Sequence, residues 1–252
     1  MKKIGKPLSV ALVLLLLWQL ASASGIWSAY VFPSPQKVFV SFLKMCQSGA
    51  VLHHIGISLS RVLTGFSIAF VLAFLLGILA GVAPKGAEYY DPFLELMRHI
   101  PPIALIPLLI LWFGIGETSK IIVIVLASFF PMFLNIKQGI ASCSKKLLEV
   151  GDCFGFSKTR KFLRIILPSA VPDILVGMRI GLGYSWRAII GAEMIAASSG
   201  LGYLILDAQQ MSRSDQVIVG ILIIGVVGIL CDRLFAVLIR HVVHGGTYES
   251  VS

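Results

Sequence analysis

The chain has 252 residues, of which 57% are hydrophobic and only 13% are charged, and its mean hydropathy is +0.92. No soluble domain of this length buries that much apolar surface, so the composition excludes a soluble globular protein and indicates an integral membrane protein. The formal net charge of +9 is compatible with nucleic-acid binding. In a membrane chain, however, clustered lysines and arginines more often report orientation, and no nucleic-acid partner is expected. The four cysteines show no CxxC spacing and no histidine at ligand spacing, so neither a disulfide framework nor a metal site is expected.

The first apolar run, residues 8–23, follows a short basic segment. We interpret it as an uncleaved first span, because the downstream spans then give a consistent charge asymmetry. The alternative is a signal peptide, since Ala21-Ser22-Ala23 resembles a cleavage site. Residues 25–51 are expected to form an outer loop that carries an amphipathic helix at about 36–46.

Two further hydrophobic runs lead to the middle of the chain. The second span is predicted at 55–82, long enough to cross with some tilt, and a polar segment, 84–99, follows it. The third span is predicted at 102–113, where prolines are tolerated if neighbouring helices satisfy the freed backbone groups. After a tight outer turn, the fourth span is predicted at 120–136, with a kink at Pro131.

The last two spans are predicted at 171–197 and 216–239. The whole chain, 1–252, is therefore expected to be one all-α, polytopic transmembrane domain of about six helices with both ends on one side.

Lysines and arginines are distributed unequally between the two sides of these spans. Fourteen lie on the side of the N-terminus: Lys2, Lys3, Lys6, Lys85, Arg98, Lys137, Lys145, Lys146, Lys158, Arg160, Lys161, Arg164, Arg233 and Arg240. Four lie on the other side: Lys37, Lys44, Lys120 and Arg213. Because cytoplasmic loops are enriched in basic residues, both termini and the loop 145–168 are expected in the cytoplasm, and the chain in the cell membrane.

The loop 145–168 is a basic island between hydrophobic spans. Its sequence predicts two short helices, 145–153 and 158–166, broken at Gly155, and Pro168 is expected to stop the second and to bias Leu167 away from helix. Apolar residues among the bases favour a docking site for a cytosolic partner, with Phe154 and Phe156 as apolar anchors. The alternative is a solvated connector that is basic only because of its topology. The candidate docking residues are Glu149, Phe154, Gly155, Phe156, Ile165, Leu167 and Pro168.

The spacing of the acidic residue, the glycine and the terminal Leu-Pro in this loop resembles the EAA loop of ABC importer permeases, with Val150 and Gly151 in place of its alanines. Stretches along nearly the whole chain resemble the nitrate/sulfonate/taurine-type branch: FPSPQKV (32–38), SLSRVLTGF (58–66), HIPPIALIPLLILWFGIGETSK (99–120), FFPMFLNIKQG (129–139) and GYSWRAIIGAEMI (183–195). The chain is identified as a member of this family.

The resemblance implies the type I permease fold and a set of partners. It implies an inner-membrane permease that works as a pair, with a second copy of this chain as the expected partner. It further implies two separate ATPase subunits, which bind ATP and Mg, and an external solute-binding protein. In the family, the EAA loop supplies the coupling helices that sit in a groove of the ATPase.

The chain has no motif of its own for catalysis. It contains no G-x-x-x-x-G-K-[ST] phosphate loop, no HExxH and no G-x-S-x-G. We therefore expect no enzyme active site and no cofactor in this chain, so the energy for active transport must come from a partner or an ion gradient.

Ionisable and small residues within the spans mark a possible translocation pathway: Arg61, Gly181, Gly183, Arg187 and Glu193. Ionisable groups in a membrane usually face a cavity or a partner, and a cavity-facing arginine suits an anionic substrate. The alternatives are arginines that reach the headgroups, which we favour for Arg179, and glycines that serve close helix packing.

The sequence thus predicts the permease subunit of an ATP-driven importer for a small, sulfonate-, taurine- or nitrate-like solute. A pyrimidine or another small organic compound is the alternative substrate within the branch. An ion-driven secondary transporter is a weaker alternative, since it predicts intramembrane carboxylates and an inverted repeat. A non-transporting scaffold or sensor is another, but it does not require the docking spacing.

Overall fold

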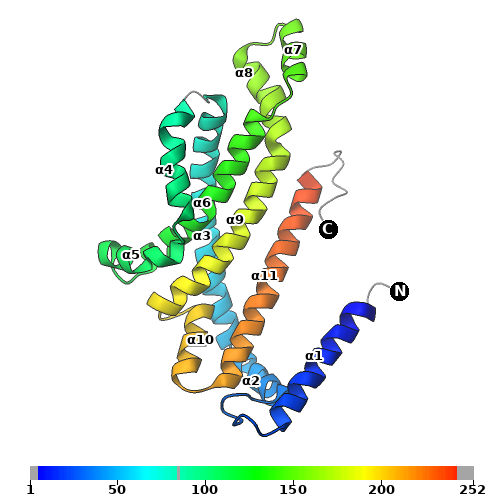
Figure 1. Cartoon of the computed structure of the whole chain (residues 1–252), viewed down its shortest axis with the longest axis vertical. Coiled ribbons are helices and arrows are strands. Elements are labelled where there is room, and N and C mark those ends of the chain that lie inside the picture. The colour runs from blue at the N-terminus through cyan, green and yellow to red at the C-terminus, as the bar shows by residue number, and fades with distance from the viewer. Residues whose placement is uncertain (1–4, 84–85, 243–252) are drawn as a thin grey trace. The chain divides into compact units, whose positions relative to one another are not determined.

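The computed structural model describes residues 5–83 and 86–242, and within these ranges it contains helices and no strand, which confirms the predicted all-α class (Figure 1). In chain order the elements are α1 (Gly5–Ala23), α2 (Pro35–Gln47), α3 (Ala50–Val82), α4 (Ala87–His99), the 3-10 turn η2 (Pro102–Leu105), α5 (Ile106–Phe113), α6 (Glu117–Ala141), α7 (Lys145–Cys153), α8 (Lys158–Lys161), the π-helical turn η3 (Phe162–Ile166), α9 (Leu167–Ala196), α10 (Leu201–Gln210) and α11 (Ser214–Val242). Lys2, Lys3 and Lys85 of the charge count, and the tail beyond residue 242, lie outside the described residues.

Four helices of the described chain are long and apolar enough to cross a membrane: Ala50–Val82, Glu117–Ala141, Lys158–Ala196 and Ser214–Arg240. The pair Tyr89–His99 and Pro102–Phe113 reaches the required length and apolarity only jointly, and it is bent by 86°. A shorter apolar helix covers Ser9–Ala23.

The third predicted span, 102–113, is not a complete span by itself. It consists of a 3-10 turn followed by the eight residues of α5. A helix of that length extends about 12 Å, compared with roughly 30 Å of hydrocarbon. The preceding segment, predicted as a polar connector, is the helix α4, which together with α5 forms a broken span or a re-entrant loop.

The structure divides into two compact units. The larger contains Leu59–Ala192 and the chain from Gly228 onward, and the smaller contains the chain up to Ser58 together with Glu193–Val227. The chain passes from one unit to the other within α3, α9 and α11.

In the larger unit, α3 packs on α6 through a stripe of small residues with a period of four, namely Gly65, Ala69, Ala73, Gly77 and Gly81. A Cβ atom added to any of the three glycines would lie 2.6–2.8 Å from an isoleucine of α6. Without a hydrophobic driving force between helices in lipid, such small residues allow the close backbone approach on which helix association depends.

Helix α6 packs equally closely on α9. A Cβ atom at Gly177 would lie 2.7 Å from Asn135, and one at Gly181 would lie 2.8 Å from Met132. The Gly177-x-x-x-Gly181 motif therefore serves helix packing within the chain. Phe133, Ile136 and other buried side chains fill the core between α3, α6 and α9.

In the smaller unit, α2 is the amphipathic helix predicted near 36–46. Ser34 caps its N-terminus by accepting a hydrogen bond from the Lys37 amide, and a proline occupies the first helical position. The Trp18 indole N–H of α1 donates to the Pro33 carbonyl, 3.1 Å away, which ties α1 to the segment before α2.

Candidate functional site

The loop 145–168 folds as two short helices joined by a tight turn at Gly155 (Figure 1). Gly155 has a φ of +67°, its amide donates to the Asp152 carbonyl, and the Phe156 amide donates to the Gly151 carbonyl. These two bonds form a Schellman motif, which satisfies the last carbonyls of α7 and places glycine at the left-handed position.

The two helices are fastened to one another at several points. The Lys161 ammonium lies 2.6 Å from the Asp152 carboxylate, and Ser157 caps α8. Gly151 is buried, and a Cβ atom there would lie 2.8 Å from the end of the Ile165 side chain. The tip of the loop is therefore a compact hairpin of helices.

One face of α7 presents apolar side chains to the exterior. Leu147, Val150 and Phe154 follow helical spacing and are exposed, and Phe154 is 73% exposed. Phe156 is only half-exposed, with the Arg160 guanidinium 4.5 Å from its ring centroid. Exposed aromatic and aliphatic side chains beside basic ones are a typical composition for a protein-binding surface.

The prediction that Pro168 ends the second helix is wrong. Leu167 has helical φ and ψ, and the helix runs without interruption over Lys158–Ala196. Proline has no N–H and clashes with the carbonyl four residues earlier, but the π-helical turn η3 widens the backbone, and the Leu167 amide donates to the Phe162 carbonyl. The tip is consequently continuous with the span α9.

The remaining docking candidates differ in their surroundings. Glu149 is exposed and has no hydrogen-bond or ion-pair partner in the described part of the chain. Pro168 is exposed, whereas Leu167 packs against the core of the larger unit. Ile165 lies beneath Gly151.

The pathway candidates on α9 fall on two sides of the helix. Gly181 is buried against α6, whereas a Cβ atom built on Gly183 would meet no atom within 4 Å apart from its chain neighbours and the backbone of its own helix. Tyr184 and Arg187 are exposed, and the Arg187 guanidinium lies 5.6 Å from the Tyr184 ring centroid. Gly183, Tyr184 and Arg187 therefore form one open face of the span.

Glu193, at the end of α9, is fully buried at 0% exposure. Both of its carboxylate oxygens lie 2.9 Å from the Ser58 hydroxyl, and one accepts a hydrogen bond from the Gly202 amide. A buried carboxylate needs such donors, because an uncompensated charge in the interior is strongly unfavourable.

This carboxylate belongs to a cap of the α10 N-terminus. Three successive amides there donate to side chains: Gly200 to His54 Nδ1, Leu201 to Ser58 Oγ, and Gly202 to the Glu193 carboxylate. The N-cap residue is a glycine, so side chains elsewhere in the smaller unit supply the acceptors that the first turn lacks. Glu193 thus places its carboxylate oxygens at the positive end of the helix dipole.

Arg61 is tied to Glu117, which the sequence analysis did not identify as its partner. The guanidinium makes two contacts of 2.6 Å with that carboxylate, and the Lys120 ammonium adds one of 2.8 Å. The Arg61 and Lys120 side chains are each only 5% exposed. One acidic residue at the start of α6 therefore neutralises part of the charge of two buried cations.

Arg179, expected to reach the headgroups, is instead paired in the membrane-spanning region. Its guanidinium contacts both oxygens of Asp232 on α11 at 2.8 Å. Both residues could be seen in the sequence as charges within predicted spans. Their pairing could not be predicted, because they are 53 positions apart and no local spacing connects them.

A comparison with protein families decides which family the chain belongs to. Residues 73–244 match the family described as binding-protein-dependent transport system inner membrane component. The chain belongs to this family. The resemblance to ABC importer permeases is thereby confirmed, and the chain is a membrane-embedded transport subunit.

Similar proteins agree with the branch that the sequence motifs indicated. The chain is 39% identical over 235 residues to the protein of Bacillus subtilis named as an aliphatic sulfonates transport permease, SsuC, covering 93% of this chain and 85% of that protein. It is 34% identical to the taurine transport system permease protein TauC of Escherichia coli, covering 87% and 82%, and 34% identical to the nitrate import permease protein NrtB of Synechocystis, covering 94% and 88%.

A solved structure supports the fold independently. A chain of the MetNI methionine ABC transporter superposes with a TM-score of 0.68 at 16% identity, covering 78% of this permease and 97% of that chain. At this identity the likeness establishes the fold alone.

Proposed function

We propose that this permease imports a small solute bearing an oxyanion, a sulfonate, taurine or nitrate, and that its loop 145–168 docks on a separate ATPase. ATP and Mg are bound by two such ATPase subunits and not by this chain. An external binding protein delivers the solute, a second copy of the permease completes the pathway, and both termini and the docking loop lie in the cytoplasm.

The observation that carries the docking proposal is the exposed stripe of Leu147, Val150 and Phe154 at the end of an unbroken helix. Residues 158–196 form one helical segment, about 58 Å long at ~1.5 Å per residue. A displacement of the tip by the ATPase is therefore transmitted to α9. Through α9 it reaches the open face at Gly183, Tyr184 and Arg187.

The substrate proposal rests on the relatives and on Arg187. Three relatives are named for aliphatic sulfonates, taurine and nitrate, all of which carry anionic oxygen atoms. Arg187 lies nine residues before the end of α9, about 14 Å along the helix. An exposed guanidinium at such a depth normally faces a cavity or a partner, and its planar donors suit oxyanions. We propose Gly183 and Arg187 as pathway residues, whereas Gly181, Arg61 and Glu193 stabilise helix packing within their own units.

The test is ATP hydrolysis in proteoliposomes that contain the permease, its ATPase and its binding protein. Taurine, an alkanesulfonate, nitrate and a pyrimidine are added one at a time. We expect stimulation by one of the oxyanions. Stimulation by the pyrimidine alone would overturn the substrate class, while solute uptake driven by an ion gradient without the ATPase would overturn the ATP-driven mechanism.

The docking role is tested with Phe154→Ser in the same assay. Loss of a central aromatic anchor should lower stimulated hydrolysis roughly tenfold or more, as expected for an interface hot spot. Phe39→Ser is the matched control, because Phe39 is an exposed phenylalanine on α2, outside the loop. Equal activity of the two variants would contradict docking through Phe154.

A further inference from the structure

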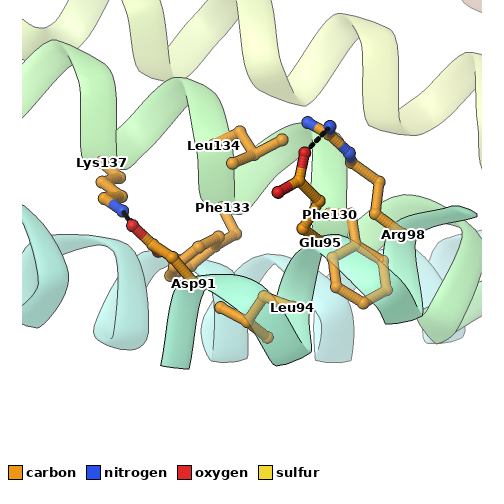
Figure 2. A pocket seen from close by; sticks show the side chains of 8 residues that line it. All are labelled: Asp91, Leu94, Glu95, Arg98, Phe130, Phe133, Leu134 and Lys137. Carbon is orange, nitrogen blue, oxygen red and sulfur yellow. Dashed lines mark hydrogen bonds and ion pairs between the residues drawn. The ribbon is translucent and has the colours of Figure 1, made fainter. Parts of the chain in front are cut away.

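A small open pocket lies between α4 and α6 in the larger unit, away from the docking loop and from the open face of α9. It has a volume of about 180 Å³, and Figure 2 shows the eight side chains that line it. Helix α4 contributes four of them: Asp91, Leu94, Glu95 and Arg98. Helix α6 contributes the other four: Phe130, Phe133, Leu134 and Lys137. Sites for drug-sized ligands usually measure roughly 300–1,000 Å³, so this pocket suits a smaller group.

The pocket carries charges of both signs in equal number. Asp91 and Glu95 balance Arg98 and Lys137, so the net charge of its ionisable lining is zero. A neutral lining of this kind favours neither a simple anion nor a simple cation. It favours a ligand that has one positive and one negative group.

The two ion pairs of the pocket differ in strength. The Lys137 ammonium lies 2.7 and 2.8 Å from the two oxygens of Asp91 and also stands 5.5 Å from the Tyr90 ring centroid. The Arg98 guanidinium reaches Glu95 at only 3.5 Å, and this is its one acidic contact in the described chain. Exposed pairs within one helix contribute little stability, so Glu95 and Arg98 are available to an external partner.

The charged groups of the pocket lie beside apolar side chains, near the C-terminal end of α6. Lys137 lies four residues and Phe130 eleven residues before the end of α6, which corresponds to about 6 Å and about 16 Å along the helix. Figure 2 shows the Phe130 ring beside Arg98, with Leu94 and Leu134 on facing helices. The opposite side of α4 carries the exposed Phe93 and Leu96, outside the pocket.

We propose that this pocket binds the headgroup of a zwitterionic phospholipid, phosphatidylethanolamine. The phosphate is held by the Arg98 guanidinium and the ammonium by the Glu95 carboxylate. The Asp91–Lys137 pair closes the end of the pocket nearer the docking loop, and the acyl chains follow Leu94, Phe130 and Leu134. Taurine also carries one ammonium and one anionic group, a sulfonate, so the experiment includes it as a free solute.

The experiment is native mass spectrometry of the full-length permease extracted with an equal mixture of phosphatidylethanolamine and phosphatidylglycerol. We expect one retained phosphatidylethanolamine, preferred over phosphatidylglycerol, and a fivefold or greater loss of this preference in both Arg98→Gln and Glu95→Gln. Arg213→Gln removes one exposed positive charge from the smaller unit and should bind as the unmodified chain does.

Three outcomes would overturn the proposal. They are no preference between the two lipids, a preference for phosphatidylglycerol, and unchanged retention in both pocket variants. Release of the lipid by millimolar taurine would reassign the pocket to a free zwitterion.

Thermal unfolding of each variant, with an unchanged midpoint, verifies that the fold is intact. The variant Arg98→Lys should keep part of the lipid binding. The assay needs no ATPase or binding protein, so its result is independent of the proposed transport function.

Discussion

At Gly200 the backbone conformation and a buried carboxylate both require a residue without a side chain. Its φ is +110°, and a Cβ atom there would lie 2.3 Å from the Glu193 carboxylate carbon. The positive φ strains the backbone of any residue larger than glycine. The collision with the Glu193 carboxylate would push that side chain away from the first turn of α10, which it caps.

Gly200→Ala is therefore expected to destabilise the permease by about 2 kcal/mol or more, since it adds a steric clash to the strain of about 1–3 kcal/mol in a backbone conformation almost confined to glycine, with φ +110° and ψ 171°. The measurement is the thermal unfolding midpoint in detergent. Gly183→Ala is the control, because its added methyl group would meet no atom within 4 Å apart from its chain neighbours and the backbone of its own helix. A glycine-to-alanine change inside a helix should stabilise it by roughly 0.5–1 kcal/mol. Equal midpoints for the two variants would contradict this account of Gly200.

The surroundings of Glu193 could be predicted from the sequence only in part. Its position in an apolar run predicted only that it faces a cavity or a partner. Its donors are Ser58, which precedes it by 135 residues, and the amide of Gly202, which becomes available only because α10 begins there. Such a partner is determined by tertiary packing and leaves no local spacing in the sequence.

At the scale of elements, the π-helical turn η3 sets the direction in which the tip of the loop 145–168 leaves α9. It occurs directly before Pro168, whose missing N–H prevents a regular α-helical bond to the carbonyl four residues earlier. A π turn holds one residue more than an α turn, so it rotates everything beyond it about the helix axis.

Pro168→Ala restores the missing N–H, and we expect η3 to convert to regular α-helix. The tip should then rotate relative to α9, so stimulated ATP hydrolysis should fall several-fold while thermal stability stays equal or rises. Pro172→Ala is the matched control, since this proline also lies inside α9 but no π turn precedes it. Normal coupling in Pro168→Ala would show that the rotation of the tip is unimportant.

The elements were predicted better than their ends and junctions. Long apolar runs determine α3, α6, α9 and α11, because a span needs about 20 consecutive apolar residues. The junction at Pro168 was not predicted, since proline is normally read as a helix stop and the π turn that tolerates it has no sequence signature. The small-residue stripe of α3 was detectable from its period of four, beginning at Gly65, but was missed.

At the scale of the molecule, the Arg179–Asp232 pair links two spans of the larger unit across 53 positions of the sequence. Removal of one partner leaves a charge in an apolar environment, whereas exchange of the two residues preserves both the charge balance and the bidentate contact.

Arg179→Asp and Asp232→Arg should therefore each lower the yield of folded permease severalfold, and the double exchange should restore much of it. Size-exclusion chromatography of detergent extracts measures this yield. Unchanged yield in both single variants would show that the pair contributes nothing to assembly. Failure of the double exchange, after loss in both single variants, would show that orientation matters as well as charge.

Arg187 is the residue through which the whole molecule is expected to recognise its solute. It is exposed on α9, beside Tyr184, at a depth where an unpaired positive charge is unfavourable unless water or an anion is near it.

Arg187→Gln should lower solute-stimulated transport at least tenfold, about 1.4 kcal/mol, while basal ATP hydrolysis by the assembled transporter remains. Arg187→Lys should recover only part of the loss, because an ammonium cannot bind an oxyanion bidentately. Arg240→Gln, which removes an exposed charge near the end of α11, is the control and should transport normally. If Arg187→Gln also transports normally, oxyanion recognition resides in the binding protein and not in this face of α9.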